Sequence, residues 1–399
     1  MRVLKITQSY SPFLEAGGPP VKVRALAHAL AARGHVVTVV AADLGLTPAT
    51  AQESGCGPGR WGWQGGKNGV EVVYLRSQAS YRRLTVNLGA RSYFRQALAS
   101  FDIAHIYGLY DLLSPAAGRA ARTAGVPYVL EPLGMTRPMD RSIRSKRAWM
   151  RWSGKKLYQG AARIMATSEM ERRELLEDGY PEGKVRLRWN GISREEFAEG
   201  PPRGSFRAKW KIADGERMVL FLSRMIPRKG ADLLIEAFAA LNGGGGRLVI
   251  AGPEGETGYA AQLQELAEKR GVAGQVIFTG PLYGREKQAA LGDADVFALP
   301  SSYENFANVA AEAVACGVPV IVTERCGIGL LVDRKAGVVI RRDTGELTRA
   351  LQELLGDEAL RNRLRAGCSE VARTLAWEKL AEEMEQHYLE VLAERDGHG

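Results

Sequence analysis

Cysteine is scarce in this 399-residue chain, which has only Cys56, Cys316, Cys326 and Cys368. None of them is spaced as a metal-ligand pair, and four are too few for a disulfide-stabilised domain. Long apolar runs are also absent, because no stretch approaches the about 18 apolar residues of a membrane-spanning helix. The first six residues are interrupted by Lys5 and lack the apolar core of a signal peptide. We therefore expect a folded cytoplasmic protein that does not span a membrane.

Acidic residues are nearly missing from one segment, 137–163. The whole chain has 54 Lys and Arg against 45 Asp and Glu, and most of the excess lies here, where only Asp140 opposes Arg137, Arg141, Arg144, Lys146, Arg147, Arg151, Lys155, Lys156 and Arg163. Trp149, Met150 and Trp152 are interleaved with these cations. A basic helix with tryptophan suits peripheral contact with an anionic membrane, such as its cytoplasmic face. The alternative is a solvated helix with its tryptophans packed inward.

No zinc-finger or RNA-recognition motif accompanies the positive charge, so no nucleic-acid partner is expected. The dinucleotide fingerprint G-x-G-x-x-G and the phosphate-binding P-loop are also absent. The basic pI of about 9.4 therefore needs another explanation than nucleic-acid binding.

Apolar runs separated by helical patterns predict a first parallel sheet. Val3–Ile6 is a strand, a helix starts at Pro19-Pro20 and ends at Gly34, and Val36–Val40 is the next strand. Further strands are predicted at 70–75, 103–106, 126–130 and 164–167. The Gly- and Trp-rich stretch from Thr47 to Asn68 indicates an excursion from the sheet.

A second sheet is predicted from Met218, with strands at 218–222, 248–251, 276–278, 296–299 and 318–322. Glu199 to Gly204 is the linker candidate, and Asn242 to Gly246 indicates a loop. The expected fold class is α/β, with two doubly wound Rossmann-like domains, 1–198 and 199–377, facing across a cleft. The segment 360–395 is predicted to be helical, and a C-terminal helix at about 378–399 is expected to pack back on the first domain. Ligands of such sheets bind beyond the carboxyl ends of the strands.

Three groups of residues stand where those strand ends are expected. Gly17-Gly18 precedes the first helix and allows close approach of a phosphate, although an ordinary tight turn explains it equally well. Arg224 and Lys229 follow the first strand of the second sheet, where they either flank a diphosphate or are two solvated cations.

The third group is a pair of carboxylates eight residues apart. Glu304 follows the strand at 296–299, and Glu312 lies on the helix that begins at about Asn308. Acids in this position can accept hydrogen bonds from sugar or ribose hydroxyls. Glu312 is surrounded in sequence by Val309, Ala310, Ala311, Ala313 and Val314, and an acid among apolar residues usually has a partner.

In this order the motifs resemble the retaining glycosyltransferases of family 4, which have the GT-B architecture. The matches are Gly17-Gly18, Arg33-Gly34-His35, Asn190-Gly191-Ile192, Ser223-Arg224 with Lys229-Gly230, and Glu304 and Glu312 with Gly317-Val-Pro-Val320. They are distributed over nearly the whole chain. The spacing of the two glutamates together with Arg224 and Lys229 is the specific part.

The resemblance implies a nucleotide-diphosphate sugar as donor and assigns catalytic roles to Arg224, Lys229 and Glu304. Arg224 and Lys229 would neutralise the diphosphate, Glu312 would hold the ribose and Glu304 the hexose. The implied donor-binding residues are Gly17, Gly18, Arg224, Lys229, Gly280, Pro281, Leu282, Glu304, Asn305, Phe306, Ala307, Asn308 and Glu312. No metal or other cofactor is expected, since the two cations and a helix N-terminus take the place of a metal.

Two positions depart from the family pattern. Ala307 stands where relatives often have glycine, and Leu133 stands where many have histidine. The candidates on the acceptor side are therefore His105, Glu131 and Leu133, with a packed strand-end imidazole as the alternative for His105.

The function expected from this resemblance is transfer of a hexose to a saccharide or lipid-linked saccharide in surface polysaccharide or glycolipid assembly. A sugar-nucleotide epimerase of the same architecture is one alternative, and a donor-binding protein without turnover is another.

Overall fold

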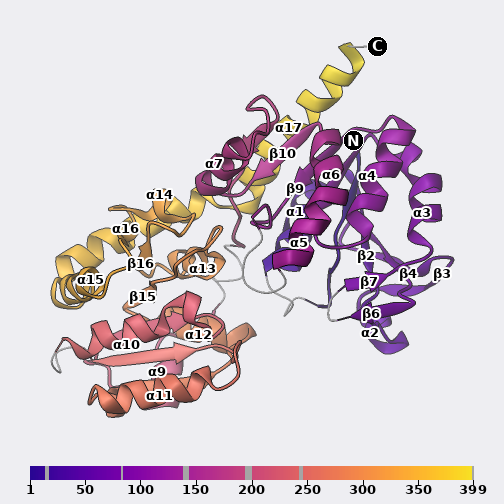
Figure 1. The fold of residues 1–399 in the computed structure, drawn as a ribbon. Helices are drawn as coiled ribbons and strands as arrows, with labels where there is room; N and C mark the ends of the chain where they lie inside the picture. Colours follow the sequence, from indigo (N-terminus) through magenta and orange to yellow (C-terminus); the bar gives the residue numbers. More distant parts are fainter. Residues whose placement is uncertain (14–17, 82–83, 138–142, 194–199, 242–245, 398–399) are drawn as a thin grey trace. The chain divides into compact units, whose positions relative to one another are not determined.

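The computed structural model describes residues 1–13, 18–81, 84–137, 143–193, 200–241 and 246–397. It divides into two units, whose helices and strands are labelled in Figure 1. Unit 1 is Met1–Gly191 with Trp377–Gly399, and unit 2 is Ile192–Ala376. Part of the expected linker, and the expected boundary at 198/199, lie outside the described residues, as do Gly17 and most of the glycine loop at 242–246.

The sheet of unit 1 has the order β11-β10-β9-β8-β1-β2-β5-β4-β3, and its strands from β11 to β5 are parallel. The parallel strands are β1 Arg2–Ile6, β2 Val36–Ala42, β5 Val70–Leu75, β8 Ile103–Tyr107, β9 Tyr128–Glu131, β10 Arg163–Ala166 and β11 Val185–Leu187. The order reverses between β1 and β8, which defines a doubly wound sheet. Most residues of these strands are buried on both faces, which explains their apolar runs.

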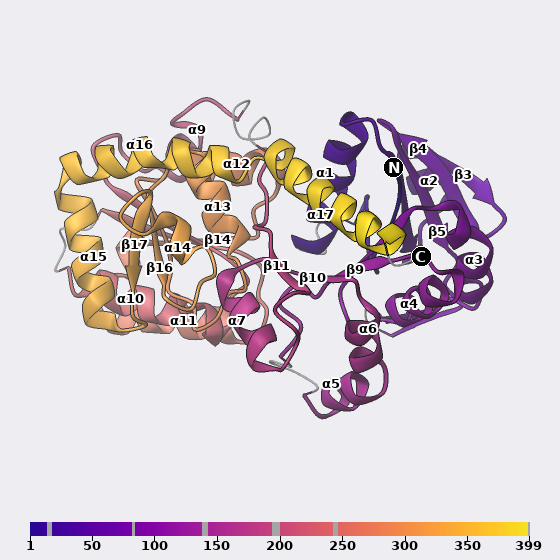
Figure 2. The same cartoon turned by 90° about the horizontal axis from the view of Figure 1, so that it is seen from above.

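Helices cover both faces of this sheet. On one face, α1 Gly18–Ala32 and α17 Trp377–Gly397 pack beside one another (Figure 2) and bury Val23, Leu26 and Leu30 with Leu380 and Met384. On the other face lie α3 Ala90–Ala97, α4 Leu113–Ala124 and α6 Lys155–Gly160. A helix at the end of the sequence therefore completes the core of the first unit.

The prediction that the stretch from Thr47 to Asn68 leaves the sheet is wrong. After the short helix α2 Pro48–Glu53, β3 Cys56–Gly59 and β4 Gly62–Lys67 pair antiparallel and extend the sheet beyond β5. The sequence gives little sign of these strands because glycines replace the usual β-branched residues. Gly65 is required here, since a Cβ would lie 2.1 Å from the Gly55 oxygen.

Unit 2 has a parallel sheet of order β14-β13-β12-β15-β16-β17. Its strands are β12 Met218–Leu222, β13 Arg247–Ala251, β14 Val276–Gly280, β15 Val296–Leu299, β16 Val320–Thr323 and β17 Gly337–Ile340. The surrounding helices are α9 Ser205–Trp210, α10 Ala231–Ala239, α11 Tyr259–Lys269, α12 Gly284–Asp293, α13 Asn308–Ala315, α14 Gly329–Val332, α15 Thr344–Gly356 and α16 Glu358–Thr374. The order reverses between β12 and β15, which makes this a second Rossmann-like unit.

The helical segment predicted at 360–395 is two helices. α16 ends at Thr374, and α17 begins at Trp377 in unit 1. No helix among the described residues is long and apolar enough to cross a bilayer.

Candidate functional site

The candidate donor site lies in unit 2 where β12 and β15 diverge. Ligands of doubly wound sheets bind beyond the carboxyl ends of the strands at such a reversal. The segment after β12 is Ser223–Gly230, with a short 3-10 turn at Pro227–Lys229. The segment after β15 is Pro300–Ala307 and leads into α13. Arg224, Lys229 and Glu304 are therefore brought to one edge of the sheet, as the sequence predicted.

An ion pair joins the two segments. The Lys229 ammonium contacts a Glu304 carboxylate oxygen, and the Ser301 hydroxyl lies 3.2 Å from the same oxygen. Lys229 and Glu304 are only 10% and 14% exposed at their side chains. A lysine and a glutamate so placed are ordered before any ligand binds.

The backbone of Arg228 fixes this geometry further. Its carbonyl accepts hydrogen bonds from the Ser302 amide at 2.9 Å and the Ser301 hydroxyl at 3.0 Å. Its guanidinium donates to the Tyr303 carbonyl at 2.8 Å. Glycine is needed at position 230, because its φ is +77° and because a Cβ there would lie 2.3 Å from the Pro300 oxygen.

Arg224 differs from these residues. It is exposed at the end of β12, and within the described part of the chain its guanidinium makes no hydrogen bond or ion pair. A guanidinium in this state presents its fork of donors to a planar or tetrahedral anion. Arg224 is thus available to an incoming ligand, whereas Lys229 is already paired with Glu304.

Glu312 has the partner that its apolar surroundings predicted. It lies on α13, and its carboxylate is 2.5 Å from the ammonium of Lys287 on α12. Its side chain is 18% exposed. Burial, together with the nearby Glu312 charge, raises the pKa of the Cys316 thiol to about 12. This thiol is therefore not a nucleophile at neutral pH.

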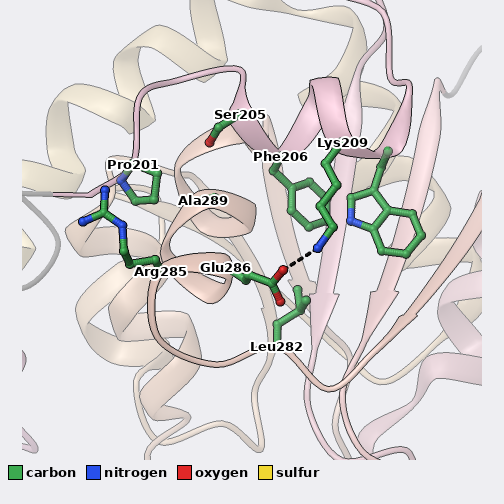
Figure 3. A pocket seen from close by; sticks show the side chains of 9 residues that line it. Pro201, Ser205, Phe206, Lys209, Leu282, Arg285, Glu286 and Ala289 are labelled. Carbon is green, nitrogen blue, oxygen red and sulfur yellow. Dashed lines mark hydrogen bonds and ion pairs between the residues drawn. The ribbon is translucent and has the colours of Figure 1, made fainter.

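Gly280, Pro281 and Leu282, which the sequence predicts to bind the donor, lie in different environments. Gly280 ends β14 with a φ of +73°, Pro281 is exposed, and Leu282 is buried. The Leu282 side chain faces a pocket of about 250 Å³ between α9 and α12, shown in Figure 3, which is lined by Pro201, Ser205, Phe206, Lys209, Trp210, Leu282, Arg285, Glu286 and Ala289. An ion pair between Lys209 and Glu286 closes one side of it.

Comparisons with known proteins identify the family. A family model described as "Glycosyl transferases group 1" matches residues 202–370, and one described as "Glycosyl transferase 4-like domain" matches residues 17–191. A D-inositol 3-phosphate glycosyltransferase of Jonesia denitrificans is 30% identical over 93% of this chain and 90% of its own length. The chain belongs to the group 1 glycosyltransferases of family 4.

Other relatives of this glycosyltransferase agree along the full length. A GDP-mannose-dependent alpha-mannosyltransferase of Mycobacterium tuberculosis is 28% identical, covering 99% of this chain and 98% of its own. Among solved structures, Anabaena HepE in complex with UDP has a TM-score of 0.77 at 18% identity, covering 97% of this chain and 99% of that one. The structural neighbours show the GT-B fold expected from the sequence.

In unit 1 of the glycosyltransferase, Glu131 is the centre of a buried charged cluster. It ends β9, has no exposed surface, and contacts the ammonium of Lys22 on α1 and the guanidinium of Arg188 at 2.6 Å. Lys22 also donates to Asn190. Although burial opposes ionisation, Lys22 and Arg188 hold the pKa of Glu131 well below its usual value. The Glu131 carboxylate thereby ties the start of α1 to the end of β11.

His105 belongs to the same cluster. Its Nε2 is 3.4 Å from Glu131 and its Nδ1 is 2.6 Å from the Tyr388 hydroxyl of α17, while its ring stacks on Tyr107. Burial lowers the pKa of His105 to about 3, so the imidazole is neutral at physiological pH. A proton on Nε2 facing Glu131 leaves Nδ1 as the acceptor for the tyrosine hydroxyl. His105 is thus the packed strand imidazole that the sequence offered as an alternative.

Leu133 lies in a tight turn after β9. Leu133 and Gly134 have φ values of +60° and +73°, and the Met135 amide donates to the Pro132 carbonyl at 3.1 Å. The turn is held by Glu171, which accepts from the Gly134 amide at 2.6 Å, and by Tyr110, which donates to the Met135 carbonyl at 2.8 Å. Of His105, Glu131 and Leu133, only Leu133 has a side chain that is not fully buried.

The basic segment forms α5 Ile143–Trp149, a π-helical turn Met150–Gly154, and then α6. Its two tryptophans differ: Trp149 is partly buried and donates to the Leu109 carbonyl at 2.7 Å, whereas Trp152 is 80% exposed. Trp149 is thus packed inward, as the second alternative expects, whereas Trp152 faces solvent and membrane contact stays a prediction. Arg141 lies outside the described residues.

Sequence reasoning missed several residues that organise the two sites: Lys22, Arg188, Arg228, Lys287 and Ser301. Lys22 gave one weak signal, a lysine in the first turns of an otherwise apolar helix face. The others needed pairings between distant segments that no local pattern reveals. Among the described residues, no group of three or more His, Cys, Asp or Glu side chains is placed to hold a metal ion.

Proposed function

We propose that the protein is a retaining hexosyltransferase that transfers a hexose from a nucleotide-diphosphate sugar to a saccharide or lipid-linked saccharide. We place it in surface polysaccharide or glycolipid assembly and propose that it works without a metal. The observation that carries the proposal is the pairing of Lys229 with Glu304 beside exposed Arg224 at the reversal between β12 and β15. One relative is a GDP-mannose-dependent mannosyltransferase and one structural neighbour is in complex with UDP, which favours a nucleotide-sugar donor here.

The main barrier of such a reaction is the negative charge that develops on the departing diphosphate. The cations at this site stabilise that charge. Arg224 supplies a free guanidinium, and Lys229 shares its charge between Glu304 and the phosphates. The acceptor hydroxyl then attacks from the side on which the diphosphate leaves, and a diphosphate oxygen takes its proton. No protein base is required in this scheme, so the buried state of His105 is compatible with turnover.

The two glutamates divide the donor between them. Glu312, on α13, accepts from the ribose hydroxyls, and Glu304 accepts from the hexose. Lys287 holds the Glu312 carboxylate in place before the donor arrives. Free nucleoside diphosphate should therefore lose affinity in Glu312→Gln, whereas Glu304→Gln should weaken binding of the full donor more.

A thermal-shift screen against nucleotide-sugars, followed by transfer assays, tests the proposal. A donor at 100 times its Kd should stabilise the fold by about 2.7 kcal/mol. Arg224→Ala and Lys229→Ala should each lower turnover by roughly 10²-fold, as for loss of one preorganised donor. Arg349 is an exposed residue of α15. Arg349→Ala is therefore the matched control, and its turnover should equal that of the wild type. Near-normal rates in both site variants would refute the diphosphate assignment.

The rival functions are separated by products. A donor-only assay that yields an isomerised sugar nucleotide would indicate the epimerase. Binding without transfer, restored by Leu133→His, would indicate a binding protein that has lost turnover. The backbone permits this substitution, since histidine tolerates positive φ better than leucine. We expect the wild type to transfer sugar.

We also propose that unit 1 touches an anionic membrane through the basic segment. Residues 1–191 contain 28 Lys and Arg against 14 Asp and Glu, whereas residues 192–399 contain 26 against 31. The exposed Trp152 stands beside Arg144, Arg147 and Arg151 on one face. Amphipathic rings of this kind lie in the interfacial region of bilayers.

Co-sedimentation with vesicles containing phosphatidylglycerol tests this contact. Each cation near the surface contributes about 1 kcal/mol before screening, so binding should fall as salt rises. Trp152→Ala should weaken it, and Arg349→Ala should not. Absence of wild-type binding at low salt would leave the segment as a solvated helix.

A further inference from the structure

The hairpin of β6 Ala79–Tyr81 and β7 Leu84–Val86 presents an apolar face to solvent. Tyr81 is paired with Leu84 and Ala79 with Val86, and residues directly opposite in a hairpin share a face. Tyr81 is 71% exposed, Leu84 40%, Val86 38% and Leu88, two residues farther on, 73%. Ala79, Tyr81, Leu84, Val86 and Leu88 are called the hairpin face below.

The opposite side of the hairpin is firmly anchored. Thr85 is fully buried, accepts from the Gln8 side-chain amide at 2.9 Å, and donates to Asn87 at 2.6 Å. Asn87 in turn donates to the carbonyls of Leu75 and Arg76 at 2.9 and 3.1 Å. Thr85 and Asn87 are thus turned inward while the apolar residues, and Ser80, face solvent, which differs from the arrangement of an ordinary surface hairpin.

Charge in the sequence segment that carries the hairpin is of one sign, although the Asp43 carboxylate accepts from the Ser77 amide at 3.1 Å at its base. Between Glu71 and Asp102 the sequence has no acidic residue, but it has the five arginines Arg76, Arg82, Arg83, Arg91 and Arg95. The arginines of this segment would be attracted to an anionic surface. The apolar hairpin face would be buried by an apolar layer that lies just below that surface. The interfacial region of a bilayer with anionic lipids has both properties.

The hairpin also lies at the same edge of the sheet as the basic segment with Trp152. It directly follows β5 and is tied to Gln8, just beyond β1, while Trp149 is tied to Leu109, just beyond β8. Both anchor points are at carboxyl ends of parallel strands, and Figure 1 shows β6, β7 and α5 at that end of unit 1. From β5 to β8 there are three strand steps, about 14 Å.

We propose that the hairpin face inserts into the interfacial region of an anionic bilayer and acts as a second anchor beside Trp152. The inference rests on the membrane contact proposed above and adds an apolar component to it. Stable peripheral attachment generally needs two signals, and here one is mainly electrostatic and the other mainly apolar. Salt weakens the first and leaves the second nearly unchanged.

Vesicle partitioning of matched variants tests this anchor. The combined variant Tyr81→Thr, Leu84→Thr and Val86→Thr keeps β-forming residues on the exposed strand positions. It should bind phosphatidylglycerol-containing vesicles at least about tenfold more weakly than wild type, at low and at high salt alike. Val36→Thr is the control, because Val36 is 50% exposed at the opposite, amino end of β2. It should bind as wild type does.

The alternatives to a hairpin anchor give different results in vesicle binding and in sedimentation. If Trp152→Ala weakens vesicle binding and the combined hairpin variant does not, the hairpin anchor is refuted while the basic contact stands. If no wild-type binding occurs, both fail. Sedimentation velocity without vesicles examines a second copy as the occupant: a wild-type dimer abolished by the hairpin variant would overturn the proposal. Should the combined variant lose cooperative unfolding, Tyr81→Thr alone decides, with about a threefold loss expected.

Discussion

Ala307 holds an unusual backbone conformation for a residue with a side chain. Its φ is +72° at the start of α13, immediately after the segment that bears Glu304. The left-handed region costs an L-residue roughly 1–2 kcal/mol, and glycine avoids that cost. The strain therefore comes from the alanine that this chain has at the position.

Ala307→Gly should therefore stabilise the protein by about 0.5–1 kcal/mol, because relief of strain exceeds the entropy that glycine adds to the unfolded chain. Urea unfolding measures the change. Ala310→Gly, in the buried middle of the same helix, should instead destabilise by at least about 1 kcal/mol. A destabilised Ala307→Gly would show that the left-handed conformation is not strained here.

His105 predicts a pH dependence of stability. Burial lowers its pKa to about 3 in the folded protein, against about 6.5 when unfolded. Between these values the unfolded state binds the additional proton, so stability is retained above pH 6.5 and falls as the pH drops below it. Lys5, Tyr107, Glu131, Arg188 and Tyr388 surround the ring and leave no room for hydration of the charged form.

The free energy of unfolding should fall by about 1.4 kcal/mol per pH unit on this account, from about pH 6 downwards. His105→Gln should remove that share of the slope, as measured by urea unfolding at several pH values. His28→Gln is the comparison variant: burial also lowers the pKa of His28, but its side chain is only partly buried, so this variant should remove less of the slope. A slope that is identical in wild type and His105→Gln would contradict the neutral, buried assignment.

The positions of the candidate donor-site residues could be predicted from the sequence, whereas their roles stay predictions. Arg224, Lys229 and Glu304 lie at strand ends that apolar runs reveal, and Glu312 is conspicuous among alanines and valines. The contacts of Glu131 escaped prediction, because Lys22 and Arg188 come from segments 109 and 57 residues away. Spacing in sequence carries no information on such pairings.

At the scale of elements, the central parallel strands were predictable because both of their faces are buried. The edge strands β3 and β4 were not, because glycines give them no alternation of apolar and polar residues. The β6–β7 hairpin was missed for a related reason: its apolar residues face solvent, so the usual pattern is reversed.

The junction at Gly191 provides a test of how α17 joins the first unit. Gly191 follows Asn190 of the buried cluster, and a Cβ there would lie 2.4 Å from the ring of Trp377, the first residue of α17. Gly191→Ala must displace this buried indole, and overpacking of this kind costs about 1–3 kcal/mol. Gly183→Ala, where a Cβ meets nothing within 4 Å, should be nearly neutral. Equal thermal stability of both variants would mean that Trp377 moves freely.

At the scale of the whole molecule, α17 makes the fold of unit 1 depend on the last residues of the sequence. Trp377, Leu380, Met384 and Tyr388 are buried in the core with α1 and the sheet, and Tyr388 also bonds His105. Burial of each large side chain contributes about 1.5–3 kcal/mol, so their sum is comparable with the about 5–15 kcal/mol that stabilises a whole domain. The expected packing of a C-terminal helix on the first unit thus has an energetic consequence.

A chain that ends at Ala376 should lose the cooperative fold of unit 1 while unit 2 stays folded. Removal of α17 uncovers the apolar face of α1 and exposes the Glu131 cluster to water, whereas α17 belongs to unit 1 and not to unit 2. Hydrogen exchange read by mass spectrometry should show unit 1 peptides exchanging at nearly unfolded rates and peptides from 218–322 protected as in wild type. A chain that ends at Glu394 lacks only residues beyond the buried part of α17 and should match wild type in both units. Retained protection of β1, β2 and β8 in the shorter chain would show that unit 1 folds without its C-terminal helix.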